Sequence, residues 1–135
     1  MEKQLAFQVE LNLPYEKALE RATAALQEEG FGVLTEIDVK ATLKKKLDLD
    51  FKRYTILGAC NPPLAHQALE SEEMIGLMLP CNVTVSETES GSRVSILNPK
   101  MMLELEPLGK DEGIQQVADQ AGARLRRVAE RLREM

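Results

Sequence analysis

The sequence has no long hydrophobic run. No apolar stretch approaches the ~20 residues that a membrane-spanning helix needs, and the apolar residues 5–7 are followed at once by the polar Gln8. A start of this kind is no signal-peptide core. We therefore expect no membrane partner and a cytoplasmic location.

An excess of positive charge is also missing. The 17 Lys and Arg residues against 22 Asp and Glu residues give a formal net charge of −5. Binding to a nucleic-acid backbone depends on clustered cations, and the two basic clusters, residues 44–46 and 124–133, have acidic residues close by. Such clusters are typical of solvated helix faces and helix ends. We therefore expect no nucleic-acid partner.

Thiol and imidazole side chains are few, with two cysteines and one histidine. In a cytoplasmic chain, two cysteines are expected to be free thiols rather than a structural disulfide. Together with one histidine they fall short of the four ligands of a structural zinc site, so a metal site would need a carboxylate, a water or a second subunit. We expect no cofactor. Because no motif with an established reaction is present, the question of enzymatic activity stays open.

What is present suits one globular domain over residues 1–135, with 44% hydrophobic and 29% charged residues. A chain of this length buries enough apolar surface to fold without disulfides or metals. Hydrophobic periodicity predicts an α+β fold in the order β-α-β-α-β-α-β-β-α, with a mostly antiparallel or mixed sheet. The predicted strands are residues 5–11, 31–39, 53–59, 75–86 and 93–97, and the predicted helices are residues 15–29, 41–47, 62–71 and 112–134.

The last predicted helix is the longest. Apolar residues recur at spacings of three and four from Ile114 to Leu132, and some 22 helical residues reach roughly 33 Å. A helix of this length is expected to pack across the sheet or to continue into a partner subunit. Residues 100–108, which precede it, are ambiguous between an edge strand and a loop.

The stretch Tyr54–Val85 holds both cysteines and the histidine, and Cys60 is its strongest candidate for a functional side chain. Asn61 is a favoured helix N-cap and Pro62 suits the first helical turn, so Cys60 is expected beside a helix N-terminus. The partial positive charge there stabilises a thiolate. A buried structural cysteine is the alternative, and Cys81, which shares a strand face with apolar residues, is more typical of it.

Three further side chains are candidates for the same site. His66 follows Asn61 by about one and a half helical turns and would act as a base if it faced Cys60; a solvent-facing histidine is the alternative. We expect Cys60, Asn61, Cys81 and Asn82 to line a small-molecule pocket, because Cys60 ends one predicted strand and the next strand carries Cys81. Any catalytic role is assigned to Cys60 and His66.

Two segments carry an unusual pair of motifs. They are G-A-C-N-P-P-L-A-H-Q-A-L at Gly58–Leu69 and G-L-M-L-P-C-N-V-T-V at Gly76–Val85. With E-E-G-F-G-V-L-T-E-I-D-V at Glu28–Val39, they resemble the family described as domain of unknown function 302, and the resemblance covers nearly the whole chain. It implies a fold similar to the TATA-box-binding-protein-like group, with a curved, mostly antiparallel sheet and helices packed on one side. It also implies a homodimer, and it implies no activity.

Three functions fit these observations. The first is binding of a small ligand or a protein partner by a small dimeric domain. The second is a thiol-dependent enzyme or redox sensor that uses Cys60, with Cys81 as the resolving partner. The third is metal binding by Cys60, Cys81 and His66. The spatial relation of the two thiols and the imidazole discriminates among the three.

Overall fold

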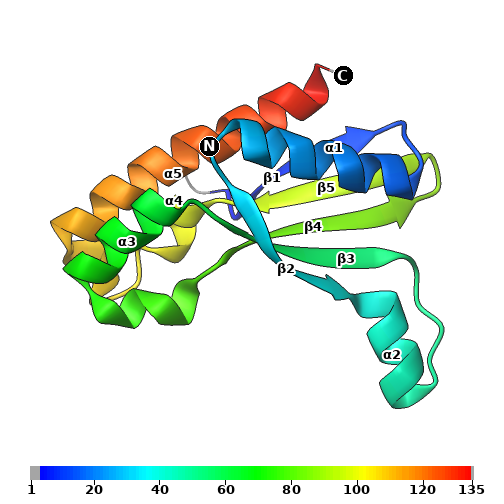
Figure 1. Cartoon of the computed structure of the whole chain (residues 1–135), viewed down its shortest axis with the longest axis horizontal. Coiled ribbons are helices and arrows are strands. Elements are labelled where there is room, and N and C mark those ends of the chain that lie inside the picture. The colour runs from blue at the N-terminus through cyan, green and yellow to red at the C-terminus, as the bar shows by residue number, and fades with distance from the viewer. Residues whose placement is uncertain (1–3, 135) are drawn as a thin grey trace.

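The computed structural model describes residues 4–134, and in this part of the chain five strands form one antiparallel sheet (Figure 1). The strands lie side by side in the order β1-β5-β4-β3-β2. Their bounds are Ala6–Leu11 for β1, Gly32–Asp38 for β2, Tyr54–Cys60 for β3, Cys81–Thr88 for β4 and Gly91–Leu97 for β5. The predicted α+β class and antiparallel sheet are confirmed.

The helices pack on one side of this sheet, as predicted. Helix α1 contacts β4 and β5, and helix α5 contacts β1 and α1. The bounds are Tyr15–Glu28 for α1, Val39–Leu47 for α2, Pro62–Ser71 for α3, Pro99–Met102 for α4 and Glu112–Arg133 for α5, with 3-10 helices η1 at Glu73–Met78 and η2 at Leu108–Lys110. Figure 1 shows α2 projecting from the end of β2, away from the other helices. None of the helices within residues 4–134 is long and apolar enough to cross a membrane.

The core lies between the sheet and the two long helices. Small side chains on α1, namely Ala18, Ala22 and Ala25, are buried and let this helix approach the strands closely. The predicted stripe of α5 is also confirmed, since its residues from Ile114 to Leu132 at helical spacing are buried. The opposite face of the sheet is more polar because strand side chains alternate between the faces. A row across it pairs Gln8 with Ser95 and Ser95 with Thr84.

A buried carboxylate ties α1 to α5. Only 5% of the Glu29 side chain is exposed, and its two oxygens accept hydrogen bonds from Arg127 Nε and Arg131 Nε, each at 2.9 Å. Burial by itself raises the pKa of a carboxyl group. The hydrogen bonds from Arg131 and Arg127 outweigh this effect, so the pKa of Glu29 lies below its usual value of 4.5.

The predicted strand at residues 75–86 begins too early. Residues 73–78 form η1, and the strand β4 starts only at Cys81. Pro80, which directly precedes it, has no backbone N–H to give to a sheet ladder. The apparent alternation continued from Leu77 into the strand, yet Leu77 is 83% exposed while Ile75 is buried.

Residues 100–108 form neither a strand nor a plain loop. Their first part belongs to the short helix α4, which begins at Pro99 with the Asn98 side chain as its cap, at 3.1 Å from Lys100 N. Met102 and Leu103 pack toward the core, and α4 contacts α5. The methionine-rich segment therefore lies against the last helix, where it closes one end of the molecule.

Candidate functional site

The two cysteines lie together at one end of the sheet. Cys60 is the last residue of β3 and Cys81 is the first residue of β4. The two strands are adjacent and antiparallel, and Ala59 is the register partner of Cys81. An antiparallel register of this kind brings the end of one strand beside the start of the next, so both thiols reach the same pocket.

Asn61 starts the helix that covers this end of the sheet. Its side-chain Oδ1 accepts a hydrogen bond from the backbone N–H of Leu64 at 3.1 Å, and prolines occupy the first turn. The capping role predicted for Asn61 is therefore present. Asn61 is itself buried, which places its amide group in the wall of the pocket rather than in solvent.

We call the cavity at this end of the molecule the cysteine pocket. It has a volume of about 40 Å³ and is bounded by β3, β4, α3, η1, α4 and α5. Its polar lining side chains are Cys60, Asn61 and Cys81. The remaining lining side chains are apolar and come from distant parts of the sequence: Phe31, Ala59, Leu64, Ala65, Ala68, Ile75, Leu79, Pro99, Met102, Leu103, Val117 and Ala121.

Burial keeps both thiols in the neutral form. It raises the pKa of Cys60, which is half-buried, and it raises the pKa of Cys81 to about 11, with a further contribution from the nearby Cys60. The ordinary value for a cysteine is near 8.5. The thiolate is the reactive form of cysteine, so these shifts disfavour nucleophilic attack by either sulfur atom at neutral pH.

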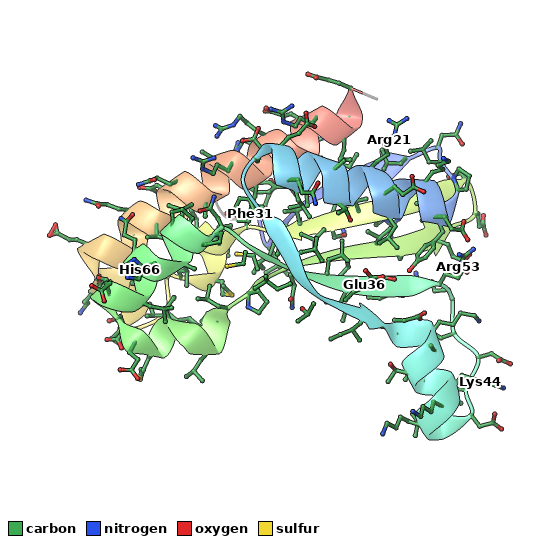
Figure 2. The ribbon with its side chains drawn as sticks, in the orientation of Figure 1. Arg21, Phe31, Glu36, Lys44, Arg53 and His66 are labelled. Atoms are coloured by element: carbon green, nitrogen blue, oxygen red, sulfur yellow. The ribbon has the colours of Figure 1, made fainter. Side chains whose placement is uncertain are left out.

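His66 and Asn82 lie outside the cysteine pocket. His66 is exposed on α3 (Figure 2) and is absent from the pocket lining. Asn82 is exposed and follows Cys81 by one residue, so it points to the opposite face of the sheet. Within residues 4–134, no three His, Cys, Asp or Glu side chains are grouped so that they could hold a metal ion. Of the four side chains predicted to share a pocket, the structure brings together Cys60, Asn61 and Cys81.

No local pattern in the sequence indicated the apolar wall that closes the pocket. Met102, Leu103, Val117 and Ala121 reach it from a short helix and from α5, far along the chain from the cysteines. The methionine-rich composition near residue 101 and the apolar stripe of α5 were the available signals. Neither pattern indicates which part of the sheet these residues will meet.

A second, polar cavity of about 140 Å³ lies at the other end of β3. The Tyr15 hydroxyl is hydrogen-bonded to Thr55 Oγ1, and the Arg53 guanidinium lies 4.5 Å from the centre of the Tyr15 ring. Arg53 also pairs with Glu16. Burial raises the pKa of Tyr15, so its hydroxyl stays protonated. These groups bind one another across α1 and β3, which indicates a structural role.

Comparison with known proteins gives a family and a structural relative. The family model described as "Domain of unknown function DUF302" matches residues 7–132. A solved structure described as "Crystal structure of uncharacterized conserved protein DUF302 from Bacillus stearothermophilus" is 27% identical in sequence, with a TM-score of 0.85. The match covers 96% of this chain and 99% of that one. No curated protein matches the chain. The resemblance inferred from the motifs is confirmed, and the chain belongs to the family described as domain of unknown function DUF302.

Proposed function

We propose that this chain binds a small apolar molecule, or the apolar end of a larger one, in the cysteine pocket. The observation that carries the proposal is the lining: twelve apolar side chains surround two neutral thiols and one amide. Apolar cavities of this kind stay dry and take up apolar guests. A few polar groups among apolar walls are the usual composition of a ligand site.

The size of the pocket limits the ligand. Sites for drug-sized ligands measure roughly 300–1,000 Å³, whereas the cysteine pocket measures about 40 Å³. A guest of a few carbon atoms fits this space. The thiols and the Asn61 amide would meet a single polar atom at its end, because they gather where β3, β4 and α3 meet.

The thiol and metal hypotheses have less support. A thiol enzyme or redox sensor needs an accessible thiolate, and burial raises the pKa of both Cys60 and Cys81. A metal site would need His66 beside the two sulfur atoms, and His66 is exposed on α3 outside the pocket. Ligand binding requires neither condition.

We also propose that the chain acts as a homodimer. Strand β2 lies at the edge of the sheet, and several large apolar side chains are exposed beside it. Edge strands with apolar neighbours are templates for pairing with a second chain. Light scattering of the purified protein should give about twice the mass of the 15.1 kDa chain. A monomer mass at micromolar concentration would contradict this part of the proposal.

Xenon and 1-propanol are suitable probes for the pocket. We expect each to shift the amide NMR signals of Ala59, Cys60 and Cys81 in a saturable way, because these residues line the cavity. Signals from α2 should not move, since no residue of α2 in the described chain lines the cysteine pocket. Shifts without saturation, or shifts spread evenly over the protein, would contradict a specific site.

A variant that fills the pocket tests the site, and the same substitution elsewhere serves as its matched control. Ala65 lines the cavity, and Ala65→Leu should occupy the space and abolish the shifts. Ala24 is exposed on α1, so Ala24→Leu makes the same change at a neutral position and should leave them intact. Circular dichroism melting of both variants verifies that they fold. If Ala65→Leu binds the probes as the unmodified chain does, the pocket is not the site.

A further inference from the structure

We propose that the homodimer forms across a two-fold axis at β2, with α2 of each copy docked on the α3–η1 region of the other. This inference rests on the proposed homodimer and names its surface. Two patches of the chain are involved. The α2 arm comprises residues 39–51, and the η1 shoulder comprises residues 69–78. Figure 1 shows α2 at one end of β2, and α3 with the segment that follows it on the other side of the molecule.

The outer side of β2 is the first part of the surface. No other strand within residues 4–134 pairs with it there, because β2 ends the strand order. Its Leu34 and Ile37 are 66% and 48% exposed. Two copies of one edge strand can pair in an antiparallel manner about a two-fold axis. The Asp38 end of one copy then lies beside the Gly32 end of the other.

This geometry carries the α2 arm of one copy toward the η1 shoulder of the other. The arm follows directly after Asp38. The shoulder follows from the opposite end of β2, since Gly32 is the register partner of Cys60. Cys60 is followed by α3 and then by η1. One two-fold axis therefore forms the arm–shoulder contact twice.

Exposed apolar side chains are concentrated on these elements. Of the large apolar side chains that are exposed in the described part of the chain, all but Leu5 and Leu105 belong to β2, the arm or the shoulder. Those on the arm and the shoulder are Leu47, Leu49, Phe51, Leu69, Met74 and Leu77. Scattered single exposures are ordinary in soluble proteins, whereas clustered ones mark interaction surfaces.

The charges of the two patches are complementary. Helix α2 has lysines at positions 40, 44, 45 and 46 and no acidic residue. The stretch 61–78 has Glu70, Glu72 and Glu73 and neither Lys nor Arg. The rest of the arm adds Asp48 and Asp50, which pair with Lys44, so four lysines and two aspartates leave the arm with a formal charge of +2. A net positive arm on an acidic shoulder favours association and fixes the orientation of the two chains. A second copy carries both patches, and a two-fold axis repeats the arm–shoulder contact, so the occupant that we propose is a second copy.

Docking would also explain how α2 persists as a helix. It has nine residues, and none of them is buried in the chain as described. Isolated helices shorter than roughly 12–15 residues are marginal in water. Burial of Leu43 and Leu47, one turn apart on α2, against a second copy would supply the packing that the chain itself does not provide.

Aspartate substitutions at exposed leucines test the surface directly. We expect Leu47→Asp on the arm and Leu77→Asp on the shoulder each to raise the dimer dissociation constant by a factor of about ten or more. Leu105→Asp is the matched control and should change it by less than about twofold. Sedimentation velocity over a concentration series measures the dissociation constants of all three variants. The three leucines are exposed, so the folded chain tolerates the substitutions.

A charge exchange gives a result that misfolding cannot imitate. Lys45→Glu/Lys46→Glu and Glu70→Lys/Glu73→Lys should each dissociate their own homodimer. Their equimolar mixture should form a heterodimer, because each mutated patch then meets the complementary one and each native patch meets a native one. If the unmodified chain is a monomer, the proposed homodimer fails. If it is a dimer that Leu47→Asp, Leu77→Asp and the charge variants leave unchanged, the homodimer stands and this surface is wrong.

Discussion

The two short helices α2 and α3 begin in the same way. Each follows a strand closely, and in each the N-cap side chain accepts a hydrogen bond from the backbone N–H three residues later. Asp38 Oδ1 accepts from Ala41 N at 2.9 Å, and Asn61 Oδ1 accepts from Leu64 N at 3.1 Å. The helices have nine and ten residues, so their local sequences specify nearly the same element.

Their surroundings differ completely. Helix α3 buries Leu64 and Ala68 over the cysteine pocket and contacts α5, whereas α2 projects from the end of β2 (Figure 1). Capping determines where a helix begins, and packing supplies most of its stability. The buried helix closes the proposed ligand site. In our proposal, a second copy of the chain packs against the exposed helix.

The largest expected difference is in thiol reactivity, between a cysteine introduced before α2 and the native cysteine Cys81 in the pocket that α3 covers. Ile37 precedes the cap of α2 as Cys60 precedes the cap of α3, and Ile37 is exposed. A thiol introduced by Ile37→Cys should titrate at or below the ordinary value of about 8.5. Cys81, with its pKa raised to about 11, should be modified at least roughly a hundredfold more slowly at pH 8.

Alkylation followed by peptide mapping, at several pH values and in dilute protein, measures these rates. The modification rate of Cys60 should lie between those of the two other thiols. Burial raises the pKa of Cys60, but the side chain is only half-buried. A Cys60 rate profile with its midpoint below pH 8 would restore the thiol-enzyme hypothesis.

Truncation of a leucine should destabilise one helix and not the other. Leu64→Ala removes a buried side chain from the pocket wall and should lower the free energy of unfolding by about 2–3 kcal/mol. Leu47→Ala on α2 should change it by less than about 0.5 kcal/mol in dilute protein, because Leu47 is 61% exposed. Urea unfolding monitored by circular dichroism gives both numbers. Equal losses would mean that α2 packs as firmly as α3.

The two regions also differ in their ion pairs. Glu29→Gln weakens the buried contacts to Arg127 and Arg131 and should cost about 1–2 kcal/mol, a value limited by solvent screening because both arginines are partly exposed. Asp48→Asn removes an exposed partner of Lys44 on the arm and should have no measurable effect. Urea unfolding of the two variants at neutral pH tests this difference.

The Glu29 contribution should depend on pH. Because the pKa of Glu29 is lowered on folding from its usual value of 4.5, the stabilisation is fully present above that value and is lost as the pH falls through the folded value. The difference in free energy of unfolding between the Glu29→Gln variant and the unmodified chain should therefore become smaller below pH 4. A deficit that stays constant from pH 7 to pH 3 would contradict the ionised pair.

Loss of the caps should give the smallest difference. Asn61→Ala should cost about 1–2 kcal/mol, because it leaves a buried backbone N–H without its partner. Asp38→Ala should cost about 0.5 kcal/mol, since water can replace the exposed carboxylate. Thermal unfolding of both variants measures which substitution costs more stability. A larger loss of stability for Asp38→Ala than for Asn61→Ala would contradict the view that α3 is packed more firmly than α2.

Most of the fold followed from local patterns. The apolar stripe of α5 and the cap at Asn61 predicted their elements because each signal is confined to neighbouring residues. The start of β4 was mistaken, since the alternation through Leu77 and Leu79 is compatible with either a strand or a 3-10 turn before Pro80.

The candidate site was predicted in part. Cys60 and Cys81 were expected to meet because two consecutive strands place them at neighbouring ends, and the structure brings them into one pocket. The exposure of His66 and the orientation of Asn82 could not be predicted, because they depend on the exact phase of a helix and of a strand. The wall from α4 and α5 depends on tertiary packing, which leaves no local signal.

Amide hydrogen exchange at two protein concentrations tests the central claim most directly. We predict that α3 is protected at both concentrations, because its packing lies within one chain. Helix α2 should be protected only at the higher concentration, where the dimer forms, and should exchange at nearly the free-peptide rate on dilution. Strong protection of α2 in the dilute monomer, or exchange of α2 that does not depend on concentration, would contradict the claim that a second copy completes this region.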